Sequence, residues 1–250
     1  MSVSFIVYSH SEYDDCWIPF FDRLRKHCKH EFDSYYLFSD ATNEKMDARF
    51  KHIEYNNEDS YTNRVLSCMK QIDTPYCLFQ HEDMMLYDDV HEEYFQHCLD
   101  WFQGGGPYPI DSIKLIKSGS PHDSQDGNSW FVEGSDVLKM TLLNFDMMFS
   151  IQPTLWNTEI FTDILEHNQN MNGWQFEERG HNRCKEIMLS ACYTHHKTDK
   201  QRGMFHWDSI VWPYIATAVF KGKWCTNEYP EELNKMFSEY NIDPKIRGTL

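Results

Sequence analysis

The sequence has no long apolar run and no run of more than two consecutive Lys or Arg residues. A transmembrane helix needs about 18 or more consecutive apolar residues, so we expect no membrane span. The formal net charge of −16 disfavours binding to nucleic acid or to an anionic membrane, because phosphate groups are bound there by clustered Lys and Arg. Residues 1–8 also lack the basic start and the small-residue cleavage site of a signal peptide. We therefore expect a cytoplasmic protein.

The motifs of several enzyme classes are absent too. There is no G-x-G-x-x-G, no P-loop and no nucleophile elbow. The glycines at 104–106 lack the Lys-Ser/Thr of a phosphate loop, and we interpret them as a turn at a helix end. The eight cysteines are spread singly along the chain, which is typical of reduced thiols rather than of a disulfide framework. Cys184, Cys192, His195 and His196 match no standard zinc spacing, so structural zinc is not expected.

The N-terminal third of the chain alternates between strand-like and helix-like segments. Residues 3–8, 32–38, 52–55 and 74–81 are apolar, with β-branched and aromatic side chains, and predict strands. Residues 14–29 and 61–72 have apolar residues at helical spacing. This alternation predicts an α/β domain with a mostly parallel sheet, whose ligand lies at the carboxyl ends of the strands.

The rest of the chain is less regular, but no linker or internal repeat divides it. We expect helices over 90–102, 159–167 and 173–191, and strands over 113–116 and 130–132. A chain of 250 residues with 41% hydrophobic content can form one large domain. We therefore predict a single domain with a nucleotide-binding half over 1–87, a second half over 88–225 and a C-terminal tail over 226–250.

Three polar residues directly follow predicted strands. Ser9, Asp40 and Asp83 are each expected just past a strand end, where parallel strands bring them to one crevice. Glu82 and Asp83 form an acidic pair between two apolar segments, and burying a carboxylate without a compensating cation or donor costs several kcal/mol. Two hard oxygen ligands suit Mg²⁺ or Mn²⁺, which take their remaining ligands from water and substrate phosphates. The alternative is that the pair simply opens a solvated loop.

Five segments carry a resemblance to a known family. The first is Ser9 together with residues 13–21, and the other four are residues 61–66, 74–86, 150–157 and 174–177. In this order they resemble nucleotide-sugar-dependent glycosyltransferases of the GT-A fold, in particular a group with a Glu-Asp pair in place of Asp-x-Asp. The match covers roughly residues 3 to 225. Two positions depart from the family's pattern: His10 replaces an acidic or small polar residue, and Met84-Met85 replace an aromatic one.

The resemblance implies a Rossmann-like N-terminal half that binds a nucleoside diphosphate sugar. Asp83 is then the expected ligand of Mn²⁺ or Mg²⁺, and Glu82 is either a second ligand or a hydrogen-bond acceptor for the sugar or ribose. Nucleotide-sugar-binding residues are also expected in the turns after the strands and on the helix that follows, namely Ser9, His10, Asp40 and Arg64. Arg64 is assigned to the diphosphate, because a guanidinium binds phosphate bidentately.

The C-terminal half is expected to bind a glycan or another hydroxyl acceptor. Glu177 is the candidate catalytic base of an inverting enzyme, and Trp156 and Trp174 are candidates for stacking on the acceptor. His206 is a candidate late metal ligand. Each has an ordinary alternative: a first-turn helix acid for Glu177, core packing for the tryptophans and a structural role for the histidine.

The expected activity is thus metal-dependent sugar transfer from a nucleotide donor. Two other functions remain open: a catalytically inactive carbohydrate- or nucleotide-binding protein on the same fold, and a metal-dependent phosphoryl-transfer or hydrolase domain. The second is disfavoured because two-metal sites need more carboxylates than one pair supplies.

Overall fold

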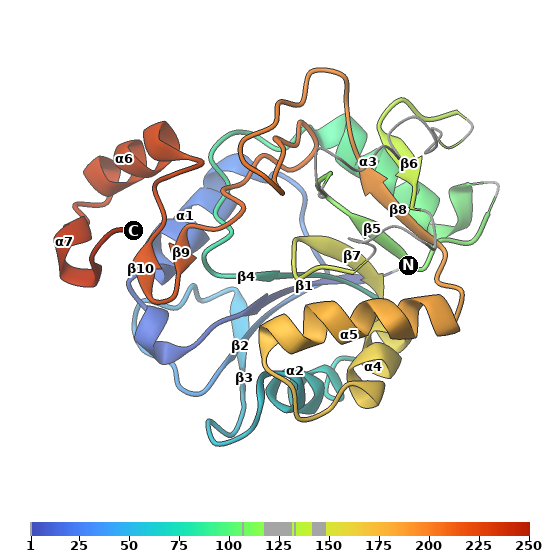
Figure 1. Cartoon of the computed structure of the whole chain (residues 1–250), viewed down its shortest axis with the longest axis horizontal. Coiled ribbons are helices and arrows are strands. Elements are labelled where there is room, and N and C mark those ends of the chain that lie inside the picture. The colour runs from blue at the N-terminus through green and yellow to red at the C-terminus, as the bar shows by residue number, and fades with distance from the viewer. Residues whose placement is uncertain (1, 107, 118–131, 133, 142–148) are drawn as a thin grey trace.

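The centre of the protein is an eight-stranded sheet with the order β3-β2-β1-β4-β7-β5-β8-β6 (Figure 1). The computed structural model describes residues 2–106, 108–117, 132, 134–141 and 149–250. Its N-terminal half consists of β1 (Val3–Tyr8), β2 (Ser34–Ser39), β3 (Phe50–Glu54) and β4 (Tyr76–His81). These four strands are parallel to one another, with β1 between β2 and β4. The predicted parallel half-sheet is confirmed.

The other half of the sheet contains both strand directions. β7 (Thr154–Asn157) is antiparallel to β4 and to β5 (Ser112–Lys114), whereas β8 (Ala191–Thr194) is parallel to β5. The edge strand β6 (Leu138–Met140) is antiparallel to β8. Only β6 and β7 therefore oppose the common direction, and the predicted α/β domain with a mostly parallel central sheet is confirmed. Residues 118–131, where part of a strand was expected, lie outside the described residues.

Helices cover both faces of the sheet (Figure 1). One face carries α1 (Trp17–His27) and α3 (Glu92–Asp100), which is extended by η2 (Trp101–Gly105). The other carries α2 (Tyr61–Met69), α4 (Thr158–His167) and α5 (Gly173–Glu186). Alternate side chains of β1 enter two separate hydrophobic clusters: Phe5 and Val7 pack in one, and Ile6 and Tyr8 in the other. Burial on both faces explains why this strand is apolar at successive positions.

The end of α5 differs from the prediction. The helix begins with a capping box between Asn172 and Gln175. It ends at Glu186 instead of continuing to 191, because Met188 adopts a left-handed φ of 52° and the Leu189 N–H donates to the Cys184 carbonyl over 2.9 Å. This six-to-one bond is the usual way in which a helix is closed. The apolar residues that follow enter β8.

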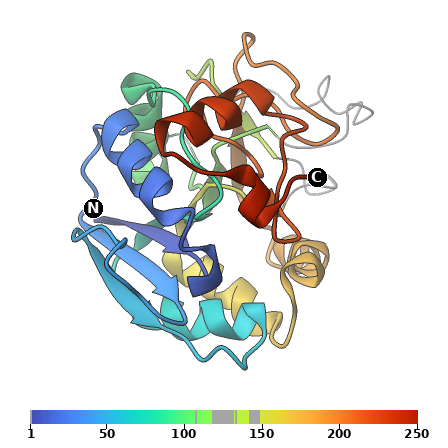
Figure 2. The same cartoon turned by 90° about the vertical axis from the view of Figure 1, so that its left-hand side faces the viewer.

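The last part of the chain packs back on the N-terminal half. It contains the hairpin β9 (Val219–Phe220) and β10 (Lys223–Trp224), then α6 (Pro230–Glu239) and α7 (Pro244–Arg247). Figure 2 shows α6 beside α1. Glu239 accepts from the Arg23 guanidinium over 2.6 Å, and Tyr240 donates to Asp22 over 2.7 Å. Residues 226–250 thus cover the outer side of α1.

None of the helices in the described residues is both long enough and apolar enough to cross a membrane.

Candidate nucleotide and metal site

The turns after three parallel strands meet at one edge of the sheet, as predicted. β2, β1 and β4 are neighbours with a common direction, so Asp40, Ser9 and Glu82 directly follow three adjacent strand ends. Backbone hydrogen bonds continue across this edge: the Ser9 N–H donates to Phe38 over 2.9 Å, and the Glu82 N–H to Tyr8 over 3.3 Å. The sheet therefore places the acidic pair beside the turns that follow β1 and β2.

Both members of the acidic pair are buried. Glu82 is 7% exposed and Asp83 is 9% exposed. Burial raises the pKa of Asp83 to about 6, while hydrogen bonds that include the Val219 N–H, 3.2 Å from Oδ2, act against this rise. Burial, with added repulsion from Asp83, raises the pKa of Glu82 well above its ordinary value. The solvated-loop alternative is therefore wrong.

The pair fits a metal that arrives together with its substrate. Among the described residues, no three His, Cys, Asp or Glu side chains are grouped so that they could hold a metal ion by themselves. Mg²⁺-type ions, however, commonly use only one or two protein carboxylates and complete their shell with substrate phosphates and water. Two buried carboxyls, of which Asp83 raises the pKa of Glu82, gain most from a cation, because it removes their repulsion. Glu82 and Asp83 could therefore hold Mg²⁺ or Mn²⁺ in this way.

His206 lies in the loop after β8 and is tied to another part of the C-terminal region. Its Nδ1 is 2.6 Å from Glu228 Oε2, so one of its two ring nitrogens is already engaged. A positive charge on His206 would lower the pKa of both Asp83 and Glu177, which places these side chains in one region of the molecule. Its role as a metal ligand remains a prediction.

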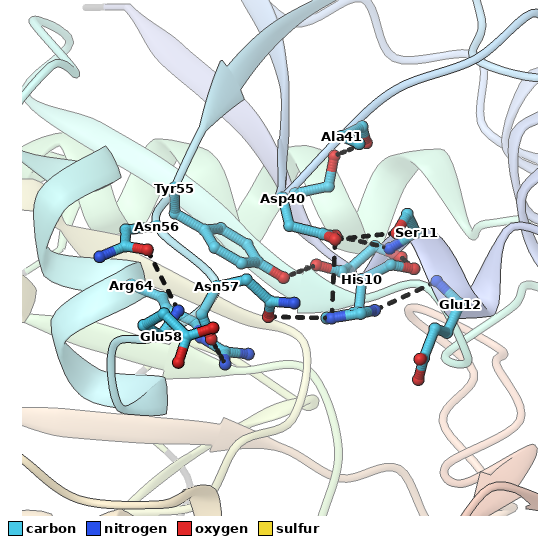
Figure 3. Close-up of polar contacts among 12 residues, drawn as sticks. His10, Ser11, Glu12, Asp40, Ala41, Tyr55, Asn56, Asn57, Glu58 and Arg64 are labelled. Atoms are coloured by element: carbon cyan, nitrogen blue, oxygen red, sulfur yellow. Dashed lines mark hydrogen bonds and ion pairs between the residues drawn. The ribbon is translucent and has the colours of Figure 1, made fainter.

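The predicted nucleotide-binding residues His10 and Asp40 do come together (Figure 3). His10 Nε2 is 3.0 Å from Asn57 Oδ1 and 3.6 Å from Asp40 Oδ2. Asp40 accepts from the Ser11 N–H over 2.7 Å and from the Ser11 hydroxyl over 2.8 Å. Burial opposes ionisation of Asp40, yet the hydrogen bonds from Ser11 outweigh it and hold the pKa of this carboxyl below its ordinary value. The site thus keeps an ionised acceptor beside an imidazole.

Arg64 borders the same cluster from α2. Its Nε donates to the Asp59 carbonyl over 2.8 Å, a terminal nitrogen donates to the Asn57 carbonyl, and the guanidinium lies 5.3 Å from the Tyr55 ring centroid. Figure 3 shows Arg64 with Asn57 on the side of Tyr55 away from Asp40. Arg64 therefore holds the loop after β3, and its predicted contact with a diphosphate would have to use its remaining donors.

Ser9, which was predicted to line the nucleotide site, has its side chain engaged inside the fold. Ser9 is fully buried, its hydroxyl accepts from Trp17 Nε1 over 2.7 Å, and its carbonyl accepts from the Tyr55 hydroxyl over 2.6 Å. The residue instead joins β1 to α1 and to the Tyr55 ring. A serine at a strand end gives no sequence signal that distinguishes a residue lining a nucleotide site from one that connects neighbouring elements of the fold.

Glu177 is placed differently from an ordinary first-turn acid of a helix. Its Oε1 accepts from the Ile151 N–H over 2.7 Å, whereas the neighbouring Glu178 is exposed. Burial raises the pKa of Glu177; the Ile151 hydrogen bond and the positive charge of Lys114 act against the rise. Lys114 is the last residue of β5, and burial lowers its pKa to about 7. Lys114 was not among the predicted site residues, although a lysine inside an apolar strand is a usable signal in the sequence.

The two candidate acceptor-binding tryptophans have opposite environments. Trp156 is 4% exposed and stacks on Phe161 with 5.2 Å between ring centroids, so the prediction that it binds an acceptor is wrong. Trp174, at the start of α5, is 67% exposed and meets the Phe220 ring edge-on at 5.8 Å. Of these two tryptophans, Trp174 is the one that presents a ring surface that an acceptor could cover.

No family model and no curated protein matches the chain. Among solved structures, S. aureus TarS 1-349 matches with a TM-score of 0.50 and 13% identity over 97% of this chain and 65% of that one. A second structure, of S. aureus TarS, matches with a TM-score of 0.50 and 14% identity over 97% of this chain and 39% of that one. The chain thus spans less than two thirds of the length of either structure. At such identities the likeness shows the fold alone. The chain has a GT-A-like fold.

Proposed function

We propose that the protein is a metal-dependent glycosyltransferase that moves a sugar from a nucleoside diphosphate sugar to a glycan or another hydroxyl acceptor. The observation that carries this proposal is the buried Glu82-Asp83 pair directly after β4, at the edge where the turns after β1 and β2 meet. An acidic protein with a net charge of −16 binds a diphosphate only where positive charge is concentrated. A divalent ion on this pair supplies that charge.

The donor site is assigned to the residues at this edge. Asp83 is proposed to hold the ion, with Glu82 as a second ligand or as an acceptor for a donor hydroxyl. A bound Mn²⁺ or Mg²⁺ would stabilise the negative charge that develops on the leaving diphosphate. The polar cluster of His10, Asp40 and Arg64 around Tyr55 is proposed to bind the base and ribose, since it offers donors and acceptors in fixed positions.

The acceptor side is assigned to α5. Glu177 is proposed to remove the proton of the acceptor hydroxyl, because a carboxyl with a raised pKa is a stronger base than an exposed one. A base that acts on the face opposite the leaving group would give inversion. Trp174, three residues earlier on the same helix, is proposed to stack on the acceptor. A positive charge on His206 would lower the pKa of both Asp83 and Glu177, and this common neighbour supports a common reaction centre.

Nucleoside diphosphates are expected to raise the melting temperature of the protein when a divalent ion is present. A ligand at a hundredfold excess over its Kd stabilises the folded state by about 2.7 kcal/mol. For a domain of this size this corresponds to a rise of about 5–10 °C. Thermal unfolding should be followed with UDP, GDP and dTDP, each with Mn²⁺ and with EDTA. If none of the three nucleoside diphosphates raises the melting temperature in the presence of Mn²⁺, the assignment of the donor site is wrong.

A further inference from the structure

The exposed indole of Trp174 has an aromatic neighbour from a distant part of the chain. Trp174 is the second residue of α5 and is 67% exposed. Phe220, the last residue of β9, meets it with the two ring planes at 89° and their centroids 5.8 Å apart. Phe220 is partly exposed, and the Lys221 ammonium lies 5.3 Å from its ring centroid. Trp174 and Phe220 therefore form an aromatic corner, in which the indole supplies the more open ring.

Backbone hydrogen bonds fix this corner relative to the acidic pair. The Ala218 N–H donates to the Asp83 carbonyl over 3.3 Å, and the Val219 N–H donates to Asp83 Oδ2 over 3.2 Å. Phe220 follows directly, about 3.3 Å further along the strand. The segment 218–220 thus holds the proposed metal ligand with its first two residues and supplies one wall of the corner with its third.

The hairpin that carries Phe220 is firmly built. Lys221 and Gly222, the two residues of its turn, have φ angles of 50° and 76°. Positive φ at both positions is typical of the two-residue turn whose twist matches that of the flanking strands. Val219 pairs with Trp224, which is fully buried. The strand that carries Phe220 is therefore held in place by the fold itself.

The other wall of the corner neighbours the proposed base. Trp174 and Glu177 are three residues apart on α5, so they lie on the same side of the helix with about 5–6 Å between their Cβ atoms. The hydrogen bond from the Ile151 N–H, 2.7 Å from Glu177 Oε1, holds this carboxyl in place. The aromatic corner is thus linked to the proposed base through α5 and to the proposed metal ligand through β9.

The chemistry of the corner suits the ring of a sugar. The face of an aromatic ring is negative, and the C–H groups of a pyranose are made positive by the oxygens that surround them, so the flat C–H face of a sugar packs on an indole. Its hydroxyls remain available for polar partners such as Glu177. An anionic acceptor is disfavoured, because Glu177 and Glu178 follow on the same helix and the net charge of the chain is −16. A serine or threonine of a peptide acceptor offers few C–H groups to such a corner.

We propose that the acceptor is a neutral glycan, one pyranose ring of which stacks on Trp174 with its edge against Phe220. This inference rests on the proposed function, which gives Asp83 and Glu177 their roles. Phe220 is then a specificity-determining residue, because it limits how a sugar can lie on the indole. The strand β9 aligns that sugar with the metal site, since the same three residues contact Asp83 and Trp174.

The test measures sugar binding and donor binding side by side. Lactose, maltose, cellobiose, mannobiose and diacetylchitobiose should be titrated by saturation-transfer NMR, with the aromatic protons of the protein saturated and with the preferred nucleoside diphosphate and Mn²⁺ present. We expect at least one disaccharide to bind, with the strongest signals from protons on one face of a single ring. Affinity for the nucleoside diphosphate should be measured by titration calorimetry in Mn²⁺.

Variants of Phe220 separate the aromatic ring from mere apolar volume. Phe220→Leu should weaken binding of the disaccharide at least tenfold, whereas Phe220→Tyr keeps the ring and should change it less than twofold. Neither variant should change donor affinity more than twofold, because the Val219 N–H that reaches Asp83 belongs to the backbone. Tyr108→Leu alters another exposed aromatic residue, 57% exposed, and should change neither affinity.

Each other outcome is decisive. Wild-type protein that binds its nucleoside diphosphate but none of the disaccharides, or Phe220→Leu that binds them as tightly as the wild type, overturns the inference and leaves the proposed function intact. Loss of donor affinity in step with sugar affinity would show that Phe220 only holds the hairpin. If the wild type binds no nucleoside diphosphate, the proposed function is overturned, and a sugar that still needs Phe220 is the ligand of a binding protein instead of an acceptor. If Phe220→Leu does not fold, Trp174→Leu changes the exposed wall of the corner, and the same selective loss is expected of it.

Discussion

Asp83→Asn is expected to stabilise the ligand-free protein and to abolish its metal-dependent binding of nucleoside diphosphates. Burial raises the pKa of Asp83 from 3.8 to about 6, so the folded state binds more protons than the unfolded state between these two values. Stability is therefore lost as the pH rises through this window, and it stays lower at neutral pH. Asparagine removes the buried charge, and its amide oxygen can still accept from the Val219 N–H.

The size and the pH dependence of this effect can be measured by thermal unfolding. A shift of this size corresponds to about 2–3 kcal/mol at pH 7, or a rise in melting temperature of about 4–10 °C. The gain should shrink as the pH falls below 6 and vanish near pH 4, where wild-type Asp83 is protonated as well. Asp73→Asn, the same change at an exposed position before β4, should leave stability unchanged. An Asp83→Asn protein that still binds a nucleoside diphosphate in a Mn²⁺-dependent way would exclude Asp83 as the metal ligand.

Glu177→Gln is expected to stop sugar transfer and to spare donor binding. The amide oxygen of glutamine can keep the hydrogen bond from the Ile151 N–H, so the local structure should survive while the basic group is lost. Removal of a general base typically lowers the rate by about 10²–10⁴-fold. Burial raises the pKa of Glu177. As the pH is lowered, wild-type turnover should therefore begin to fall at a higher pH than the ordinary pKa of an exposed glutamate.

Turnover and donor affinity should be measured separately for this variant. Glu178→Gln changes the exposed neighbour on the same helix turn and is expected to retain wild-type turnover. If Glu177→Gln keeps half or more of the wild-type rate, Glu177 is not the base. If it loses donor binding to the same degree as turnover, its role lies in the structure of the donor site.

The sheet edge that forms the site could be predicted from the sequence because its signals are local. The β-α-β alternation predicts strand ends at 8, 38 and 81, and the structure has them at 8, 39 and 81. The residues after parallel strands then lie at one edge by geometry alone. The same alternation of strands and helices predicted that Glu82 and Asp83 lie at this edge of the sheet. The burial of this pair was not in the local pattern, since Val219 of β9, far along the chain, donates to the Asp83 carboxylate.

Other parts of the site depend on contacts that a local pattern does not carry. Trp156 and Trp174 are the same residue type near predicted helix starts, yet one lies in the core and the other in solvent. Trp156 lies in the core because it pairs with both β4 and β5 in the central sheet. Val219 donates to Asp83 across 136 residues of sequence, so no spacing could have linked the hairpin to the acidic pair.

The central claim is tested most directly by donor turnover. The protein should be incubated with UDP-, GDP- and dTDP-linked sugars, with Mn²⁺ and with EDTA, and release of the nucleoside diphosphate measured, with water replacing the unidentified acceptor. We predict release from at least one donor with Mn²⁺, a loss of release in EDTA, and none from Asp83→Asn. Diphosphate binding without release from any donor would indicate an inactive binding protein, and phosphate release without a sugar donor would indicate a hydrolase; either result would contradict the proposed glycosyltransferase.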